Sequence, residues 1–126
     1  MHTDVLIIGA GLTGTVAADE IIRCSDLRVL QLGSGSGASP YIHGFCMPVG
    51  EGDSEELLYA DTMASGYGQS DPRLVHSLCS RAAALEEYFA GLELELDKNE
   101  DGYRLLHALG SSVPRIASIH NDTGAV

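Results

Sequence analysis

Apolar and polar positions follow two different spacings along the first part of the chain. Val5 to Ile8 is a continuous apolar run, which is typical of a strand buried on both faces of a parallel sheet. After a glycine-rich turn, apolar residues recur at helical spacing and predict a helix from about Gly11 to Arg23. Leu27 to Leu32 is a second short apolar run. Residues 1–33 are therefore expected to form a βαβ unit, and the fold class to be α/β with a parallel sheet.

A helical pair is expected over residues 53–91. Asp53 with Glu56 three positions later forms a capping box, which predicts a first helix over about residues 54–65. Asp71 followed by Pro72 predicts the start of a second helix, because proline is favoured at the first helical position.

The second helix is expected to run to about Ala90, where Gly91 ends it. Its apolar residues are predicted to share one stripe that faces the core: Leu74, Val75, Leu78, Ala82, Leu85 and Phe89.

Residues 92–126 read as a strand pair followed by a loop. Leu92 to Leu96 alternates apolar and acidic residues, which predicts a half-exposed strand. A turn-rich stretch then leads into the apolar Tyr103 to Leu106, so a hairpin is expected. From Gly110 onward the chain is expected to be loop-like.

Composition narrows the class of protein. The 126 residues fit one small domain, with 44% hydrophobic and 20% charged residues, as in globular proteins. The formal net charge of -11, from 18 acidic and 7 basic residues, argues against nucleic acid and anionic lipid as partners. No run approaches the ~18 apolar residues that a membrane span needs, so no membrane insertion is expected.

The sequence predicts no metal site and a cytoplasmic location. Cys24, Cys46 and Cys79 are odd in number and include no C-x-x-C pair, which argues against a disulfide framework or a zinc site. Reduced thiols in the cytoplasm are the simplest interpretation.

The turn between the first strand and helix reads G-A-G-L-T-G. Gly9 permits the tight turn, Gly11 allows the backbone to approach a diphosphate, and Gly14 allows close packing of helix and strand. The backbone N–H groups at the helix start are expected to be free to bind the anion. The alternative is a glycine turn that serves packing alone.

The same motif requires an acid ~20 residues further on, where it binds the cofactor ribose. Gly33 stands at that position, and no carboxylate occurs between Leu27 and Gly50. Losing a hydrogen bond of this kind costs ~1.5–3 kcal/mol of binding. Ser34 or Ser36 is a weak substitute, so we expect an intact diphosphate half and an incomplete ribose half.

With these motifs in order, the chain resembles the N-terminal part of the FAD-binding domain in the flavoproteins of fumarate reductase, succinate dehydrogenase and L-aspartate oxidase. The resemblance is carried by DVLIIGAGLTGTVAADEI, by GSGSGASPYIHGF, by the helical pair, and by the closing VPRIASIHNDTGAV. It covers nearly the whole chain. It implies a Rossmann-like fold that is incomplete at its C-terminal end.

The resemblance implies a set of cofactor-binding residues. Its positions are Gly9, Ala10, Gly11, Leu12, Thr13 and Gly14 at the diphosphate, Gly33 in place of the family's ribose-binding Glu, and Ser39 and Gly44 near the flavin. Ser34, the weak substitute for the missing acid, completes the predicted set. Pro40 stands where some relatives carry a flavin-linking histidine, and His43 lies three residues further on, so the implied FAD is non-covalent. Asp122 matches the family's closing segment and is a candidate for a role near the cofactor or for a helix cap.

In that family the residues that clamp substrate and donate the proton lie in a capping domain. No equivalent is present here, so no catalytic residue is assigned. The expected function is the FAD-binding portion of an oxidoreductase, inactive by itself. It would be completed by a missing C-terminal half or a partner subunit. Two alternatives stay open: a nicotinamide cofactor in the same fold, and a remnant or partner-dependent subunit with weak or no cofactor binding.

Overall fold

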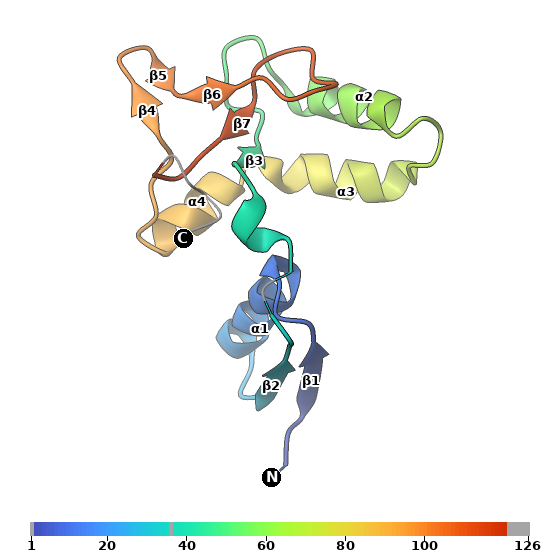
Figure 1. Cartoon of the computed structure of the whole chain (residues 1–126), viewed down its shortest axis with the longest axis vertical. Coiled ribbons are helices and arrows are strands. Elements are labelled where there is room, and N and C mark those ends of the chain that lie inside the picture. Colours follow the sequence, from blue (N-terminus) through green and yellow to red (C-terminus); the bar gives the residue numbers. More distant parts are fainter. Residues whose placement is uncertain (1, 36, 121–126) are drawn as a thin grey trace. The chain divides into compact units, whose positions relative to one another are not determined.

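The computed structural model describes residues 2–35 and 37–120, and it divides the chain into two compact units, Met1–Ile42 and His43–Val126. In the first unit, β1 (Val5–Ile8) leads through α1 (Leu12–Cys24) to β2 (Val29–Leu32), as labelled in Figure 1. β1 and β2 pair in parallel, from Val5 opposite Val29 to Ile8 opposite Leu32. The predicted βαβ unit is thus confirmed.

The prediction that β1 is buried on both faces is wrong for the described structure. Leu6 is 51% and Ile8 is 85% exposed, and no described residue of the first unit is fully buried. The sheet of this unit has two strands, so each strand keeps one unpaired edge, and within the described part of the unit α1 packs on them. The apolar run therefore has too few neighbours to bury it.

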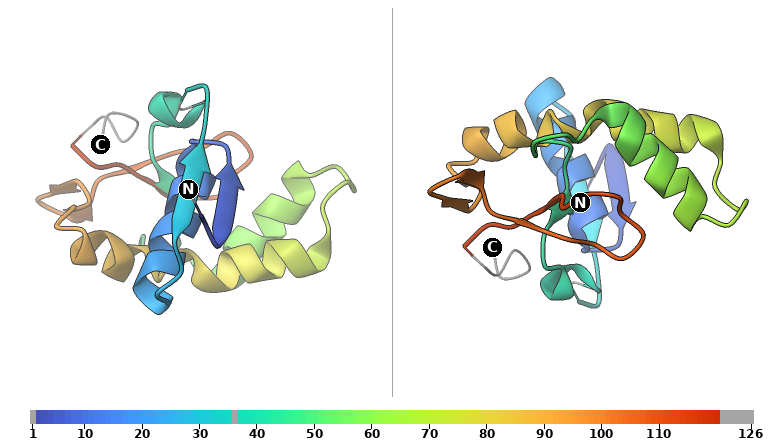
Figure 2. Two further views of the ribbon diagram at one scale, coloured as in Figure 1. Left: turned by 90° about the horizontal axis from the view of Figure 1, so that it is seen from below. Right: turned by 90° about the horizontal axis from the view of Figure 1, so that it is seen from above.

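The second unit begins with its helices. These are α2 (Glu55–Ser65), α3 (Pro72–Ala82) and α4 (Leu85–Gly91). α2 and α3 lie side by side, as both views of Figure 2 show, and bury a first cluster between them: Leu58, Val75, Cys79 and Ala82.

The single helix predicted from Pro72 to Ala90 is interrupted. The Ala84 N–H donates to the carbonyl of Arg81 at 3.1 Å, a three-residue turn that separates α3 from α4. α3 and α4 contribute buried residues to two different clusters, so their apolar residues do not form the single stripe that was predicted. Leu74 and Leu78, expected in the core, are 71% and 58% exposed.

A second buried cluster joins α4 to the strands. Its members are Met47, Phe89, Leu96, Ala117 and Ile119. The Phe45 and Phe89 rings pack there at a centroid distance of 4.9 Å.

Short antiparallel strands complete this unit. β3 (Phe45–Cys46), β7 (Ile116–Ala117) and β6 (Leu105–Leu106) form one sheet in the order β3-β7-β6. β4 (Lys98–Asn99) and β5 (Gly102–Tyr103) form a hairpin, but its first strand lies within the stretch predicted as the turn, and not at residues 92–96.

Two strand predictions are wrong. Residues 92–96 form no strand, and Leu96 alone makes an isolated bridge with Ile119. Conversely, β7 lies in the part of the chain that was expected to be loop-like. Strands of two residues are too short to show an alternating pattern, so their pairing partners decide whether they form.

The predicted N-cap is wrong for α2 and is confirmed for α3. Ser54, not Asp53, caps α2 by accepting a hydrogen bond from the Leu57 N–H at 3.1 Å. Asp71 caps α3 as predicted, and it accepts from the Arg73 N–H at 2.8 Å.

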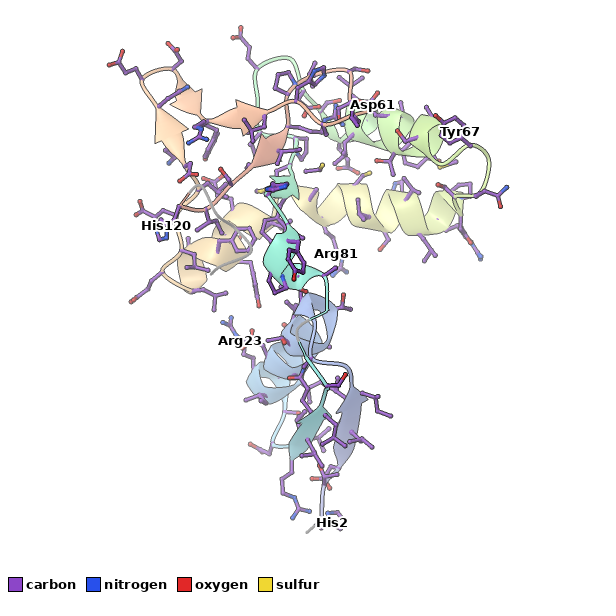
Figure 3. All side chains as sticks on the ribbon, viewed as in Figure 1. His2, Arg23, Asp61, Tyr67, Arg81 and His120 are labelled. Carbon is purple, nitrogen blue, oxygen red and sulfur yellow. The ribbon has the colours of Figure 1, made fainter. Side chains whose placement is uncertain are left out.

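Asp53 is drawn from the predicted cap into a buried ion cluster, defined as Arg115, Asp53, Asp61 and Ser112. Arg115 Nη2 lies 3.0 Å from Asp53 Oδ1 and 2.9 Å from Asp61 Oδ2. Asp61, labelled on α2 in Figure 3, also accepts hydrogen bonds from the N–H and hydroxyl of Ser112 at 2.7 and 2.6 Å. A buried charge needs such partners because its transfer from water is costly. The cluster therefore ties α2 to the segment that leads into β7.

Two features are absent from residues 2–35 and 37–120. No helix in these ranges is long and apolar enough to cross a membrane. No group of three or more His, Cys, Asp or Glu side chains there is placed to hold a metal ion.

Candidate functional site

A cavity of about 580 Å³ opens at the N-terminal end of α1, within the first unit. It is lined by β1, the glycine turn, the start of α1 and the segment around the short 3₁₀ helix η1 (Ser39–Tyr41). The lining residues are Ile7, Ile8, Gly9, Gly11, Leu12, Thr13, Gly14, Ala17, Gly37, Ala38, Ser39 and Ile42. Six of the ten residues predicted to bind a cofactor are in this set.

The glycine turn has the geometry that the motif requires. Gly9 has φ +120°, a conformation that side chains rarely allow, and its N–H donates to the Leu32 carbonyl at 2.7 Å. A Cβ on Gly14 would lie 2.4 Å from the Gly9 carbonyl oxygen. Any larger residue at Gly14 would force the helix away from the turn.

The amides at the start of α1 are only partly free, which corrects the expectation from the sequence. The Leu12 N–H donates to Ser39 Oγ at 2.9 Å, because the first amides of a helix have no partner within it and take a nearby acceptor. The N–H groups of Thr13 and Gly14 donate to no acceptor among the residues that the structure describes. They remain available to an anion, and Ser39 lies beside them.

Gly33 is packed closely against the turn. A Cβ built on Gly33 would lie 2.4 Å from Ala10 Cβ and 2.9 Å from Ala10 N. The methyl group of Ala10 therefore fills the space that an acid at Gly33 would need. Ser34 is exposed in a bend, and Ser36 lies outside the described residues, as does Asp122.

Gly44 belongs to the second unit, where packing alone accounts for it. A Cβ on Gly44 would lie 2.4 Å from the Ala117 carbonyl oxygen and 2.6 Å from Ile116 Cγ2. The predicted contact of Gly44 with a flavin stays a prediction.

Sequence reasoning missed Gln31, which lies behind the turn. Its Nε2 donates to the Gly9 carbonyl at 2.9 Å and lies 3.4 Å from Thr15 Oγ1. The available signal was a single amide side chain in the otherwise apolar strand VLQL.

The cavity is lined by glycines, apolar side chains and the hydroxyl groups of Thr13 and Ser39, and no lining side chain among the described residues is ionisable, so the cavity is suited to binding. The shifted groups of this unit lie elsewhere. Hydrogen bonds from Arg28 lower the pKa of Asp4, and a hydrogen bond to Glu20 raises the pKa of Cys24.

Comparisons with known proteins agree with this geometry. A family model described as "FAD binding domain" matches residues 4–124. Among curated proteins, L-aspartate oxidase of Vibrio cholerae is 31% identical over 96% of this chain and 24% of its own length. The acrylate reductase flavoprotein subunit of Shewanella woodyi is 30% identical over 98% of this chain and 26% of its own length. The chain thus spans about a quarter of the length of these relatives.

Solved structures give the same result. The Mycobacterium smegmatis Sdh1 complex superposes with a TM-score of 0.82 at 25% identity, over 97% of this chain and 22% of that one. The FrdA chain of E. coli quinol fumarate reductase superposes with a TM-score of 0.87 at 18% identity, over 98% of this chain and 22% of that one. The second likeness bears on the fold alone. Together these matches confirm the resemblance that the motifs indicated.

Proposed function

Because the chain belongs to the FAD binding domain family, we propose that it binds FAD non-covalently as part of a flavoprotein related to fumarate reductase and succinate dehydrogenase. The observation that carries the proposal is the cavity at the start of α1, where a glycine turn leaves backbone N–H groups available. Such helix starts favour phosphate groups through both hydrogen bonds and the helix dipole.

The residues present fit the diphosphate. Gly11 lines the cavity without a side chain, so a phosphate can approach the backbone closely. The N–H groups of Thr13 and Gly14 are the proposed donors. Ser39 uses its oxygen as an acceptor for Leu12, which leaves its own hydroxyl proton to donate to a phosphate oxygen.

The ribose end fits less well. Gly33 supplies no carboxylate, and Ala10 occupies the adjoining space. We therefore expect affinity for FAD to be ten to a hundred times lower than in a site that has this charged hydrogen bond, the equivalent of ~1.5–3 kcal/mol. Pro40 supplies no group for a covalent flavin link, which supports non-covalent binding.

The bound flavin would supply two-electron redox chemistry. The chain's own proposed contribution is to hold the diphosphate, because the described residues that line the cavity offer backbone N–H groups and hydroxyls but no ionisable side chain. Substrate binding and proton donation are assigned to polypeptide beyond this chain, either a further part of the same protein or a partner subunit. The cytoplasmic location stays a prediction.

The need for such a partner is supported by the exposed apolar surface of the first unit. Leu6, Ile8 and Leu32 on the two strands are 51%, 85% and 51% exposed, whereas parallel strands are ordinarily covered on both faces. This is also the observation that favours the second candidate, a partner-dependent subunit with little cofactor binding. Light scattering separates the two: concentration-dependent association without FAD binding would favour the second candidate.

The test of the main proposal is a titration of the purified chain with FAD, followed by flavin fluorescence. We expect saturable binding in the wild type. In Gly14→Val the binding should be lost, because the added side chain meets the Gly9 carbonyl within 2.4 Å at its Cβ. The matched control is Gly91→Ala, since a Cβ at Gly91 meets nothing within 4 Å. A wild type that does not bind FAD, or equal binding by Gly14→Val, would refute the proposal.

A further inference from the structure

Gln31 is the one polar side chain of β2, and its amide group contacts the glycine turn at the Gly9 carbonyl. Its register partner on β1 is Ile7, and its neighbours on β2 are leucines. A half-buried amide in this setting loses free energy unless it is hydrogen-bonded. Gln31 Nε2 meets that need by donating to the Gly9 carbonyl at 2.9 Å.

The Gly9 backbone is consequently held by β2 through both of its polar groups. Its N–H donates to the Leu32 carbonyl at 2.7 Å, and its carbonyl accepts from Gln31. The residue adopts φ +120°. Because glycine has no side chain, many other backbone conformations are also open to it. Two hydrogen bonds from one strand select a single orientation among them.

The same amide also contacts α1. Gln31 Nε2 lies 3.4 Å from Thr15 Oγ1, and a Cβ on Gly14 would come within 3.1 Å of it. Gln31 thus stands where strand, turn and helix meet. A rotation of the Gly9 peptide would move the start of α1 and with it the N–H groups of Thr13 and Gly14, two residues that line the cavity.

We propose that Gln31 is a positioning residue for the diphosphate: it fixes the Gly9 peptide and so holds the N–H groups of the turn in a phosphate-binding arrangement. It also keeps the Gly9 carbonyl oxygen hydrogen-bonded. The inference rests on the proposed function, and it adds a residue from outside the cavity lining.

The experiment compares Gln31→Leu and Gln31→Glu with the wild type. Both variants lose the amide donor, while Gln31→Glu keeps the shape of the side chain, so it separates the hydrogen bond from packing. The matched control is Gln69→Leu, the same chemical change at an exposed position of the second unit. Ligands are FAD, ADP and, as a probe without phosphate, adenosine.

We expect FAD and ADP to bind roughly two- to tenfold more weakly in both variants, the affinity equivalent of one neutral hydrogen bond. Binding of adenosine should change less. In the ligand-free protein, hydrogen exchange in a peptide spanning residues 9–15 should be faster in both variants and unchanged in Gln69→Leu.

The two readouts distinguish the two proposals. If the wild type binds FAD while the variants match it in affinity and exchange, the role of Gln31 is refuted and the proposed function stands. If the wild type binds no FAD or ADP, the proposed function fails, and the assignment of Gln31 to the diphosphate fails with it. Faster exchange in the variants would then support only the clamp on Gly9. Wild-type behaviour in Gln31→Glu alone would overturn the hydrogen bond as the cause.

Discussion

Replacing Arg115 by methionine tests how the second unit is held together. The side chains of Arg115 and Asp53 are both 0% exposed, and that of Asp61 is 14% exposed. Methionine fills much of the same volume but leaves the buried Asp53 carboxylate without its cation. Removing one member of a buried ion pair costs about 3–5 kcal/mol, a large share of the ~5–15 kcal/mol that stabilises a typical domain.

The assay is urea unfolding followed by tyrosine fluorescence, since the protein has five tyrosines and no tryptophan. With an m-value of ~1.5 kcal/mol/M, the midpoint of Arg115→Met should fall by roughly 2–3 M. Arg81→Met is the control, because Arg81 is an exposed cation of α3 (Figure 3). Its free energy of unfolding should change by no more than about 0.5 kcal/mol.

A second substitution sharpens the test. Asp53→Asn keeps the oxygen that accepts from the Ser54 N–H at 2.8 Å but removes the charge. It should destabilise the wild type, because Arg115 loses a partner, and stabilise Arg115→Met, because the unpaired carboxylate disappears. The reasoning is wrong if the free energy of unfolding of Arg115→Met lies within about 1 kcal/mol of the wild-type value. It is also wrong if Asp53→Asn changes the free energy of unfolding in the same direction in the wild type and in Arg115→Met.

Three further predictions concern other parts of the chain. Gly33→Glu should bind FAD more weakly, because its Cβ would lie 2.4 Å from that of Ala10. Gly33→Glu combined with Ala10→Gly should bind more tightly than the wild type by about tenfold, and FAD titration checks both. Hydrogen bonds from the side chain and backbone of Ser112 lower the pKa of Asp61 below its usual 3.8. Its stabilising contribution is therefore complete above about pH 4 and is lost as the pH falls through the lowered value. Urea midpoints at pH 3 and pH 6 should differ less in Asp61→Asn than in the wild type. Phe89→Ala should lower the free energy of unfolding by about 3–5 kcal/mol, as measured by urea unfolding, since Phe89 is 7% exposed.

Each of these has an outcome that contradicts it. If the single variant Gly33→Glu bound FAD more tightly than the wild type, the segment around Ala10 would have to shift at little cost to admit the new side chain. Equal pH dependence in Asp61→Asn and the wild type would remove Asp61 from the acid response. A loss below 1 kcal/mol in Phe89→Ala would mean that α4 contributes little to the second cluster.

The first unit shows how far local pattern reaches. Two apolar runs separated by a glycine turn and a helical repeat predicted β1, α1 and β2, since each signal lies within a few residues of its effect. The same holds for Asp71 and Pro72, whose cap contacts are local. The exposure of β1 was not predicted correctly, because it depends on distant parts of the chain. The run from Val5 to Ile8 was expected to be buried, and it lies in a sheet of two strands.

The candidate site divides along the same line. The glycine spacing indicated the turn, and the missing acid at Gly33 was visible by counting. The contacts that complete the turn come from 22 and 27 residues away, namely Gln31 on Gly9 and Ser39 on Leu12. The spacing of the glycines predicts neither of these two hydrogen bonds.

The sequence by itself determined where the first strands and helices form and which residues make the glycine turn, because those choices rest on neighbours in the chain. Only the tertiary structure decided that one predicted helix divides between two cores, that Asp53 pairs with Arg115 while Ser54 caps α2, and that Ser39 accepts the hydrogen bond of the Leu12 N–H. Each of these is a choice among partners distant in sequence. It is settled by which polar group or apolar face lies within reach once the chain has folded.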